Sequence, residues 1–453
     1  MPIAARALPA SPARGPFAGQ LARGAAAAFL VYGGSAGVSY FAQLAVARIV
    51  GPASYGVYAY VLAWVTVLAY FCALGFDVSL LRFVSAYRAQ QEWGLVRGVT
   101  RYADRVVAAA GIGVALAGVV VVLALGAVRG EFARTFLSGF ALVPVLALLW
   151  IRCSAARAFG GVVTALAPDR LVRDGLLLVF VVALGPGLGW HIDAARAMDA
   201  TVIAGAVGLA LASVARRRLA PRHCVEAAPR GDSRTWIRTV APLVVLGAVE
   251  ALMNRTGVVL LGWIGAVTEA GIYAVAFNVA FLATLPRVAV NALFAPAISE
   301  LFVSNDRVAL QALMTRTAVW TFLGAVAIAL PLLVLIGPVL SWFGHDFSAG
   351  VTAARILLVG QVVASAAGSQ LHIMTMTGRE RAAAAILTAT AAGNALLGVV
   401  LVPLLGLEGA AVAASVSLVA WNVAMAMFIR RTIALRPGLL AALAPTGAEV
   451  RVP

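Results

Sequence analysis

Polar side chains recur at helical spacing inside two long apolar runs of the sequence. The first run carries one polar stripe at positions i, i+3, i+7 and i+11, formed by Tyr32, Ser35, Ser39 and Gln43. The second run contains Glu250, Asn254 and Arg255 among apolar neighbours. Polar groups are costly inside a bilayer, so these side chains are expected to face the protein interior or a water-filled cavity. For the serines, the alternative is that small side chains only allow neighbouring helices to pack closely.

Two residues of the second run are charged and lie deep within it. Arg255, whether paired or facing water, is a candidate contact for an anion, because a guanidinium binds phosphate and carboxylate groups strongly. Glu250 is the carboxylate that we place deep in a predicted membrane span. It is a candidate for binding a coupling proton or sodium ion. It is equally a candidate counter-ion for an arginine across the bundle, Arg255 included.

Two further groups are candidates for lining a cavity. One face of the run near 351–373 would carry Gln361, Ser365, Ser369 and His372. Arg152 and Arg157 lie at the end of the run near 136–154. They would form a positive inner mouth of a cavity, or they would extend along the helix end to reach the lipid headgroups.

The composition sets the class of protein that must position these residues. Hydrophobic residues make up 62% of the chain and charged residues only 11%, against about 25% in soluble proteins. Many apolar runs are long enough to cross a bilayer as helices. All 34 basic residues are arginine, and they lie at membrane edges rather than in one basic domain, which argues against nucleic-acid binding. We find no Gly-rich phosphate loop with lysine, no metal-ligand spacing and no hydrolase elbow. The expectation is therefore a non-enzymatic membrane protein without a metal or organic cofactor.

The runs are arranged as a duplication. Six spans are predicted near 25–50, 57–75, 103–127, 136–154, 172–190 and 197–215, and six more near 240–264, 271–290, 314–338, 351–373, 381–403 and 409–429. Adding 215 to each span of the first set leads close to one of the second, and Tyr55-Gly56 aligns with Ala270-Gly271 at the same offset. Six spans per half is an even number, so both halves enter the membrane in the same direction. The prediction is an all-α protein of about twelve transmembrane helices, in two parallel-repeat lobes around a central cavity.

The predicted organisation follows from these spans and from the arginines. It has a cytosolic tail (1–24), an N-lobe (25–215), a basic cytosolic linker (216–239), a C-lobe (240–430) and a second cytosolic tail (431–453). With both termini in the cytosol, the arginines that do not face the cytosol are Arg255, inside a helix, and Arg48, Arg129, Arg134, Arg196 and Arg355, outside. This asymmetry follows the positive-inside rule.

Several segments resemble one known family. Residues 47–58 (ARIVGPASYGVY) and 74–83 (LGFDVSLLRF) resemble the N-terminal half of the polysaccharide biosynthesis flippases, which translocate O-antigen or exopolysaccharide units. These flippases belong to the multidrug/oligosaccharidyl-lipid/polysaccharide exporter superfamily. Residues 377–381 (TGRER) and 401–411 (LVPLLGLEGAA) are similar as well, and the resemblance extends over roughly 20–432.

The resemblance implies a flippase of the bacterial cytoplasmic membrane that moves a polyprenyl-pyrophosphate-linked oligosaccharide to the outer leaflet by alternating access. Besides this lipid and the membrane lipids, a polysaccharide polymerase and a chain-length regulator are candidate partners. Cationic cavity residues would bind the anionic headgroup, and the candidates are Arg48, Arg255, Arg152 and Arg157. The sequence departs from the family in carrying few charges deep in its first-half helices. The alternatives are a cation-coupled multidrug antiporter of the same superfamily, or a non-transporting component of a polysaccharide assembly complex.

Overall fold

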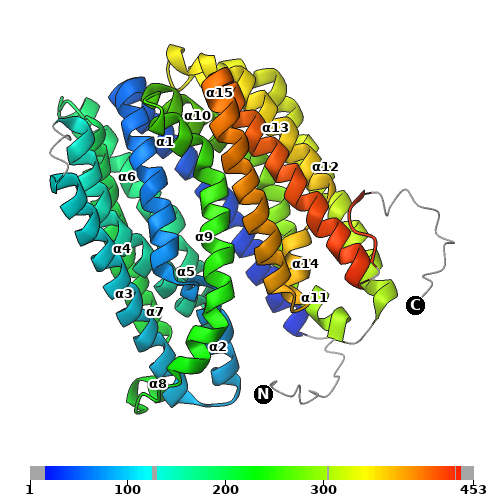
Figure 1. Cartoon of the computed structure of the whole chain (residues 1–453). Coiled ribbons are helices and arrows are strands. Elements are labelled where there is room, and N and C mark those ends of the chain that lie inside the picture. Colours follow the sequence, from blue (N-terminus) through cyan, green and yellow to red (C-terminus); the bar gives the residue numbers. More distant parts are fainter. Residues whose placement is uncertain (1–15, 125–129, 304–305, 434, 440–453) are drawn as a thin grey trace.

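The structure, a computed structural model, describes residues 16–124, 130–303, 306–433 and 435–439. Within these residues, nine helical segments are long and apolar enough to cross a membrane. Two of them, 33–89 and 380–433, turn back at a kink and cross twice, and the helical run 162–187 adds one further crossing (Figure 1). The protein is therefore an all-α polytopic membrane protein, and the part of the chain that the structure describes makes the predicted twelve crossings, in two six-helix lobes around a central cavity.

The two double crossings are the long helices α1 (Pro16–Ala73) and α15 (Glu380–Ile433). Each contains one glycine with non-helical backbone angles, Gly51 at φ 79° and Gly406 at φ 55°. A positive φ is strained for residues with a Cβ atom, so glycine is the residue that lets the chain reverse there. The resulting hairpins correspond to the predicted pairs of spans on either side of these glycines.

The first half of the chain builds the N-lobe. After α1 come α2 (Phe76–Ala89), α3 (Trp93–Ala124), α4 (Glu131–Ala158), α5 (Val162–Ala167), the π-helical turn η1 (Pro168–Val172), α6 (Arg173–Val182), the π-helical turn η2 (Ala183–Gly187) and α7 (Ala194–Leu219). Helix α4 lies at the centre of this lobe, where it packs against α1, α3 and α7. The side chain of Asp193 caps α7 by accepting a hydrogen bond from the backbone amide of Arg196 at 2.9 Å.

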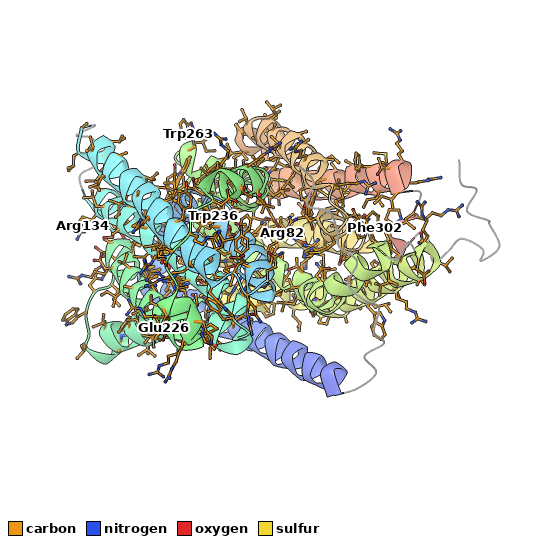
Figure 2. The ribbon with its side chains drawn as sticks, turned by 90° about the horizontal axis from the view of Figure 1, so that it is seen from below. Arg82, Arg134, Glu226, Trp236, Trp263 and Phe302 are labelled. Carbon is orange, nitrogen blue, oxygen red and sulfur yellow. The ribbon has the colours of Figure 1, made fainter. Side chains whose placement is uncertain are left out.

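The second half builds the C-lobe. It contains α9 (Ser233–Trp263), α10 (Val267–Phe281), the 3-10 turn η3 (Leu282–Thr284), α11 (Leu285–Val303), α12 (Arg307–Ser341), the 3-10 turn η4 (His345–Gly350), α13 (Val351–Ala366), α14 (Gln370–Met376) and α15. Helix α9 joins the lobes (Figure 1). Its first turns pack against α2 and α3, with Trp236 beside Tyr102, and its later turns pack against α15. Seen from below, Trp236 lies among other side chains, whereas Trp263 projects from the edge and is 75% exposed (Figure 2).

The lobes meet most closely at one end of the bundle, which we call the sealed end and define by residues 51–60 and 262–271. A Cβ atom on Gly56 would lie 2.1 Å from the backbone oxygen of Val267, and one on Gly271 would lie 2.7 Å from the Cα atom of Gly56. Gly56 and Gly271 are equivalent positions of the predicted duplication. Equivalent residues meet in this way on a two-fold axis between similar halves, as a parallel repeat requires.

The lobes are also joined at the opposite end. The Arg82 guanidinium of α2 lies 4.0 Å from the Glu380 carboxylate at the start of α15, and Arg82 stays 71% exposed near the boundary of the two lobes (Figure 2). An exposed pair at this distance contributes little to stability. The lobe contact at this end is therefore easier to break than the backbone contact at the sealed end.

Part of the predicted linker 216–239 is helical. Helix α7 continues to Leu219, the short helix α8 (Arg222–Glu226) follows, and α9 begins at Ser233. The linker docks on the start of α3, where the backbone amide of Arg230 donates to the backbone oxygen of Gly94 at 2.9 Å. Helix α1 likewise begins at Pro16, inside the segment predicted to be a loose tail. Residues 1–15 and 440–453 of the two predicted tails, and Arg129, lie outside the described residues.

Three further helix boundaries differ from the prediction. The span predicted at 172–190 starts ten residues earlier, at Val162, and the span predicted at 271–290 continues to Val303. The span predicted at 351–373 ends at Ala366, where Gly368 at φ 80° interrupts the helix before α14. In the first two cases, charged residues mark the predicted end but lie inside the helical run, because they face a cavity instead of lipid.

Candidate functional site

A cavity of about 440 Å³ lies between the lobes, lined mainly by α1, α4, η1 and α6 of the N-lobe. The C-lobe contributes Arg255 of α9, Asn278 of α10 and residues of η3 and α11. We call it the N-lobe cavity. Its volume lies within the range of roughly 300–1,000 Å³ that is usual for pockets that bind small molecules.

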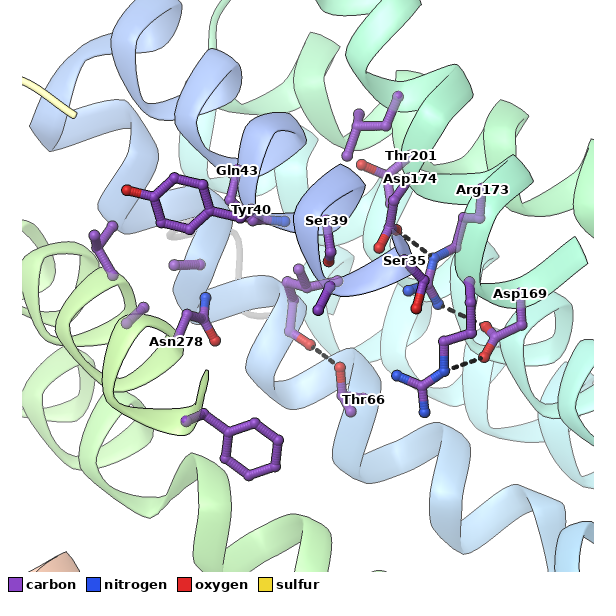
Figure 3. Close-up of a pocket in the computed structure, with 18 of the residues that line it drawn as sticks. Ser35, Ser39, Tyr40, Gln43, Thr66, Asp169, Arg173, Asp174, Thr201 and Asn278 are labelled. Atoms are coloured by element: carbon purple, nitrogen blue, oxygen red, sulfur yellow. Dashed lines mark hydrogen bonds and ion pairs between the residues drawn. The ribbon is translucent and has the colours of Figure 1, made fainter. Parts of the chain in front are cut away.

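The polar stripe of α1 forms one wall of this cavity. Ser35, Ser39 and Gln43 all line it, as predicted from their spacing (Figure 3). The side chain of Gln43 is held by Tyr55, whose hydroxyl donates to Gln43 Oε1 at 2.9 Å. Tyr32 belongs to the same stripe, but its side chain lies outside the described residues.

Beside this stripe, next to Ser35, the cavity wall carries a charged cluster that was not predicted (Figure 3). Arg173 is held between two carboxylates, with Nη1 at 3.0 Å from Asp169 Oδ1 and Nε at 2.9 Å from Asp174 Oδ1. Asp169 also accepts a hydrogen bond from Trp150 Nε1 at 3.3 Å, and its Oδ2 lies 3.5 Å from Nε of Arg170. The π-helical turn η1 carries Asp169 and Arg170, and the first turn of α6 carries Arg173 and Asp174. π-helical turns occur frequently at functional sites.

Arg255 faces the same cavity from α9. Among the described residues it has no hydrogen-bond or ion-pair partner, whereas both carboxylates of the cavity already contact Arg173. The cavity therefore contains three arginines and two acids, and the charge left without a counter-ion is positive. An unpaired guanidinium in a partly buried site favours binding of an anion.

A second cavity of about 170 Å³ lies within the C-lobe, and we call it the C-lobe cavity. It is lined by five of the residues predicted to face a cavity: Glu250, Asn254, Gln361, Ser369 and His372. Two segments that are far apart in sequence are joined beside it: Asn291 Nδ2 lies 3.3 Å from His372 Nδ1, and the Ser369 hydroxyl donates to Asn291 Oδ1. Gln361 and His372 were predicted to share one helix face. They line the same cavity, although the helix is interrupted between them at Gly368.

The two cavities are neighbours. Phe281, Thr284 and Val288 line both of them, so the η3 turn and the start of α11 form a shared wall. The predicted trio of α9 is divided between them, because Arg255 faces the N-lobe cavity while Glu250 and Asn254 face the C-lobe cavity. A contact between Glu250 and Arg255, which the sequence left open, is not formed within the described residues.

Three predicted arginines line neither cavity. Arg48 is exposed near the sealed end. Arg152 is held between helices, with Nε at 3.4 Å from Asp104 Oδ1 and Nη1 donating to Ser213 Oγ at 2.5 Å, so it ties α4 to α3 and α7. Arg157 is packed at the end of α4, where its buried Nε has no hydrogen-bond partner among the described residues.

Sequence reasoning missed Asp169, Arg170, Arg173 and Asp174 in the N-lobe cavity and Arg287 in the C-lobe cavity. One signal was available, since Asp169 and Arg173 are four residues apart and can pair on one helical face. The hydropathy pattern pointed the other way, because four charged residues within six positions indicate the end of a membrane helix. Arg287 carried no comparable signal beyond its place near the predicted end of a span.

The comparisons with known proteins agree with this architecture. Residues 21–302, more than half of the chain, match the family described as polysaccharide biosynthesis protein. The chain belongs to this family. A search of curated proteins gave no match.

Solved structures share the fold of this family member at low identity. The inward-facing conformation of a multidrug resistance MATE family transporter of the MOP superfamily has a TM-score of 0.72 at 13% identity, covering 91% of this chain and 96% of that one. The outward-facing conformation of such a transporter has a TM-score of 0.67 at 14% identity, covering 91% and 95%. A MOP superfamily transporter from Pyrococcus furiosus, described as having a binding pocket of reverse polarity, has a TM-score of 0.65 at 13% identity, covering 91% and 95%. At these identities the likeness establishes the fold.

Proposed function

We propose that this protein is a flippase that moves a polyprenyl-pyrophosphate-linked oligosaccharide from the cytoplasmic to the outer leaflet of a bacterial cytoplasmic membrane. Its family and its fold support a membrane transporter. The observation that supports an anionic substrate is the excess of arginines over acidic residues in the N-lobe cavity, where Arg255 is unpaired among the described residues. A pyrophosphate entering a site of low dielectric needs such partners, because an uncompensated buried charge is expensive.

The proposed movement is a rocking of the N-lobe (25–215) against the C-lobe (240–430), with the lipid tail remaining in the bilayer between them. If both termini are cytosolic, the sealed end faces outward, and the structure corresponds to the state that loads substrate from the cytosol. The weak ion pair between Arg82 and Glu380 lies at the loading end. The outward-open state would require the Gly56–Gly271 contact to separate.

The test is translocation of a fluorescent polyprenyl-pyrophosphate oligosaccharide in proteoliposomes, comparing wild type, Arg255→Ala and Arg48→Ala. Charge-assisted hydrogen bonds contribute about 1.5–3 kcal/mol, so loss of Arg255 should reduce transport at limiting substrate by roughly tenfold to a hundredfold. Arg48→Ala is the matched control, because it removes an exposed arginine outside both cavities and should retain transport. Equal transport by Arg255→Ala and wild type would remove Arg255 from the substrate site.

A cation-coupled multidrug antiporter is the second candidate function. It is favoured by the likeness to MATE transporter structures and by Glu250, which has no ion-pair partner among the described residues. However, Arg287 lines the same cavity as Glu250 and balances its charge. Export of cationic dyes against a proton or sodium gradient, with no movement of pyrophosphate lipids, would select this alternative.

A further inference from the structure

Arginines gather at one edge of the N-lobe, outside the two cavities, where α3, α4 and α7 come together. The Asp104 carboxylate of α3 lies 3.4 Å from Nε of Arg152 on α4 and 2.8 Å from Nη1 of Arg216 on α7. One carboxylate thus serves two guanidinium groups. The side chains of Arg152 and Arg216 are 23% and 19% exposed, so a ligand at the surface can reach both of them.

Two further arginines of α3 add positive charge beside Asp104. Arg101 and Arg105 are exposed, and neither has a hydrogen-bond or ion-pair partner among the described residues. They are four residues apart, so their side chains are neighbours on one face of the helix. We call Arg101, Arg105, Arg152 and Arg216, together with Asp104, the basic edge. Its four guanidinium groups exceed its one carboxylate, so the edge is strongly positive and attracts anions.

The face of α3 that carries Arg105 continues as exposed apolar surface. Ile112, Leu116 and Leu123 follow Arg105 at spacings that keep them on that face, and they are 52%, 61% and 66% exposed. Helix α3 is long and apolar enough to cross a membrane, so these side chains are expected to contact lipid tails. The basic edge therefore lies where the exposed face of α3 changes from charged to apolar, which is the level of the lipid headgroups.

We propose that the basic edge binds the headgroup of a phospholipid of net negative charge, with the acyl chains lying along the apolar face of α3. Guanidinium groups bind phosphate oxygens in a bidentate fork, and basic sites between membrane helices are suited to anionic headgroups. The excess of positive charge favours an anionic lipid over a zwitterionic one. The adjoining apolar face favours a lipid over a soluble anion. This site is separate from the N-lobe cavity and does not depend on which substrate that cavity binds.

The experiment measures binding of single phospholipids to the full-length protein in detergent by native mass spectrometry. The probes are cardiolipin, phosphatidylglycerol and the zwitterionic phosphatidylcholine, together with glycerol phosphate, which carries the phosphate without acyl chains. The test variant combines Arg101→Gln with Arg105→Gln. The matched control combines Arg430→Gln with Arg431→Gln, in the last turn of α15, which is also predicted to face the cytosol. All four of these arginines are exposed, so both variants should fold.

The wild type and the control variant should bind at least one of the two anionic lipids more tightly than phosphatidylcholine. In the test variant this affinity should fall by roughly thirtyfold, which is about fivefold for each arginine near an anionic headgroup. The proposal is overturned if the test variant binds the anionic lipids as tightly as the control variant does, or if phosphatidylcholine binds as tightly as they do. It is also overturned if glycerol phosphate displaces these lipids at equal concentration, because the acyl chains would then contribute nothing.

Discussion

Asp169 should act as a built-in competitor of the anionic substrate. Its carboxylate lies 3.0 Å from Nη1 of Arg173 and 3.5 Å from Nε of Arg170, on the wall of the N-lobe cavity. A pyrophosphate that approaches these arginines meets the negative charge of Asp169 at close range. Asp169→Asn removes that charge and keeps the size of the side chain, and Arg173 would retain Asp174 at 2.9 Å.

The expected gain in affinity can be bounded from these contacts. Two unit charges about 4 Å apart interact by about 4 kcal/mol at an effective dielectric of 20. The anion will sit farther away than this, and Arg170 is 52% exposed, so screening by water and salt reduces the effect. We therefore expect pyrophosphate to bind about 1–2 kcal/mol more tightly, which is roughly fivefold to thirtyfold.

Isothermal titration calorimetry with inorganic pyrophosphate, on nanodisc-embedded protein, measures this directly. The matched control is Asp199→Asn, since Asp199 accepts a hydrogen bond from Ser138 on the exposed surface and does not line the cavity. The gain should shrink as salt is raised. Unchanged or weaker binding in Asp169→Asn, with the protein folded, would refute the view that the substrate competes with an internal carboxylate.

Three other outcomes follow from the packing. Gly56→Leu should prevent the sealed end from closing, because even a Cβ atom would lie 2.1 Å from the Val267 backbone oxygen, and spin-label distances across that end should lengthen relative to wild type. Burial raises the pKa of the Cys224 thiol, so less of the reactive thiolate is present near neutral pH; alkylation by a water-soluble maleimide should be slow there and accelerate as the pH rises towards that pKa. Arg152→Ala should lower thermal stability through loss of the contact with Asp104, by about 1–3 kcal/mol, and leave pyrophosphate affinity unchanged in calorimetry.

The fold could be predicted from the sequence because its signals are long and repeated. The apolar runs specify membrane helices, and the offset of 215 residues specifies two similar lobes. The contact between Gly56 and Gly271 is the physical counterpart of that offset. The stripe of Ser35, Ser39 and Gln43 was readable for the same reason, since helical periodicity alone places these residues on one face.

The charged part of the site could not be predicted from the sequence. The free-energy cost of burying these charges is offset by ion pairs that become visible only in the folded structure. Arg173 is tolerable inside the bundle once Asp169 and Asp174 pair with it, yet a hydropathy scan counts each of these residues as a penalty. Arg152 is the opposite case. The sequence made it a candidate for a cavity, but in the structure it pairs with Asp104, which is far away in sequence. Partners that are distant along the chain decide both cases.

The wall shared by the two cavities has a consequence for the proposed transport cycle. Phe281, Thr284 and Val288 belong to the η3 turn and its flanks, where α10 passes into α11 through a 3-10 turn instead of a continuous α-helix. A break of this kind is a natural place for a helix to bend. The proposed pyrophosphate contact, Arg255, lies on one side of this wall, and Glu250 and Arg287 line the cavity on the other side. A bend at η3 would then change the shape of both cavities at once, so loading and release of the headgroup would be coupled to the rocking of the lobes.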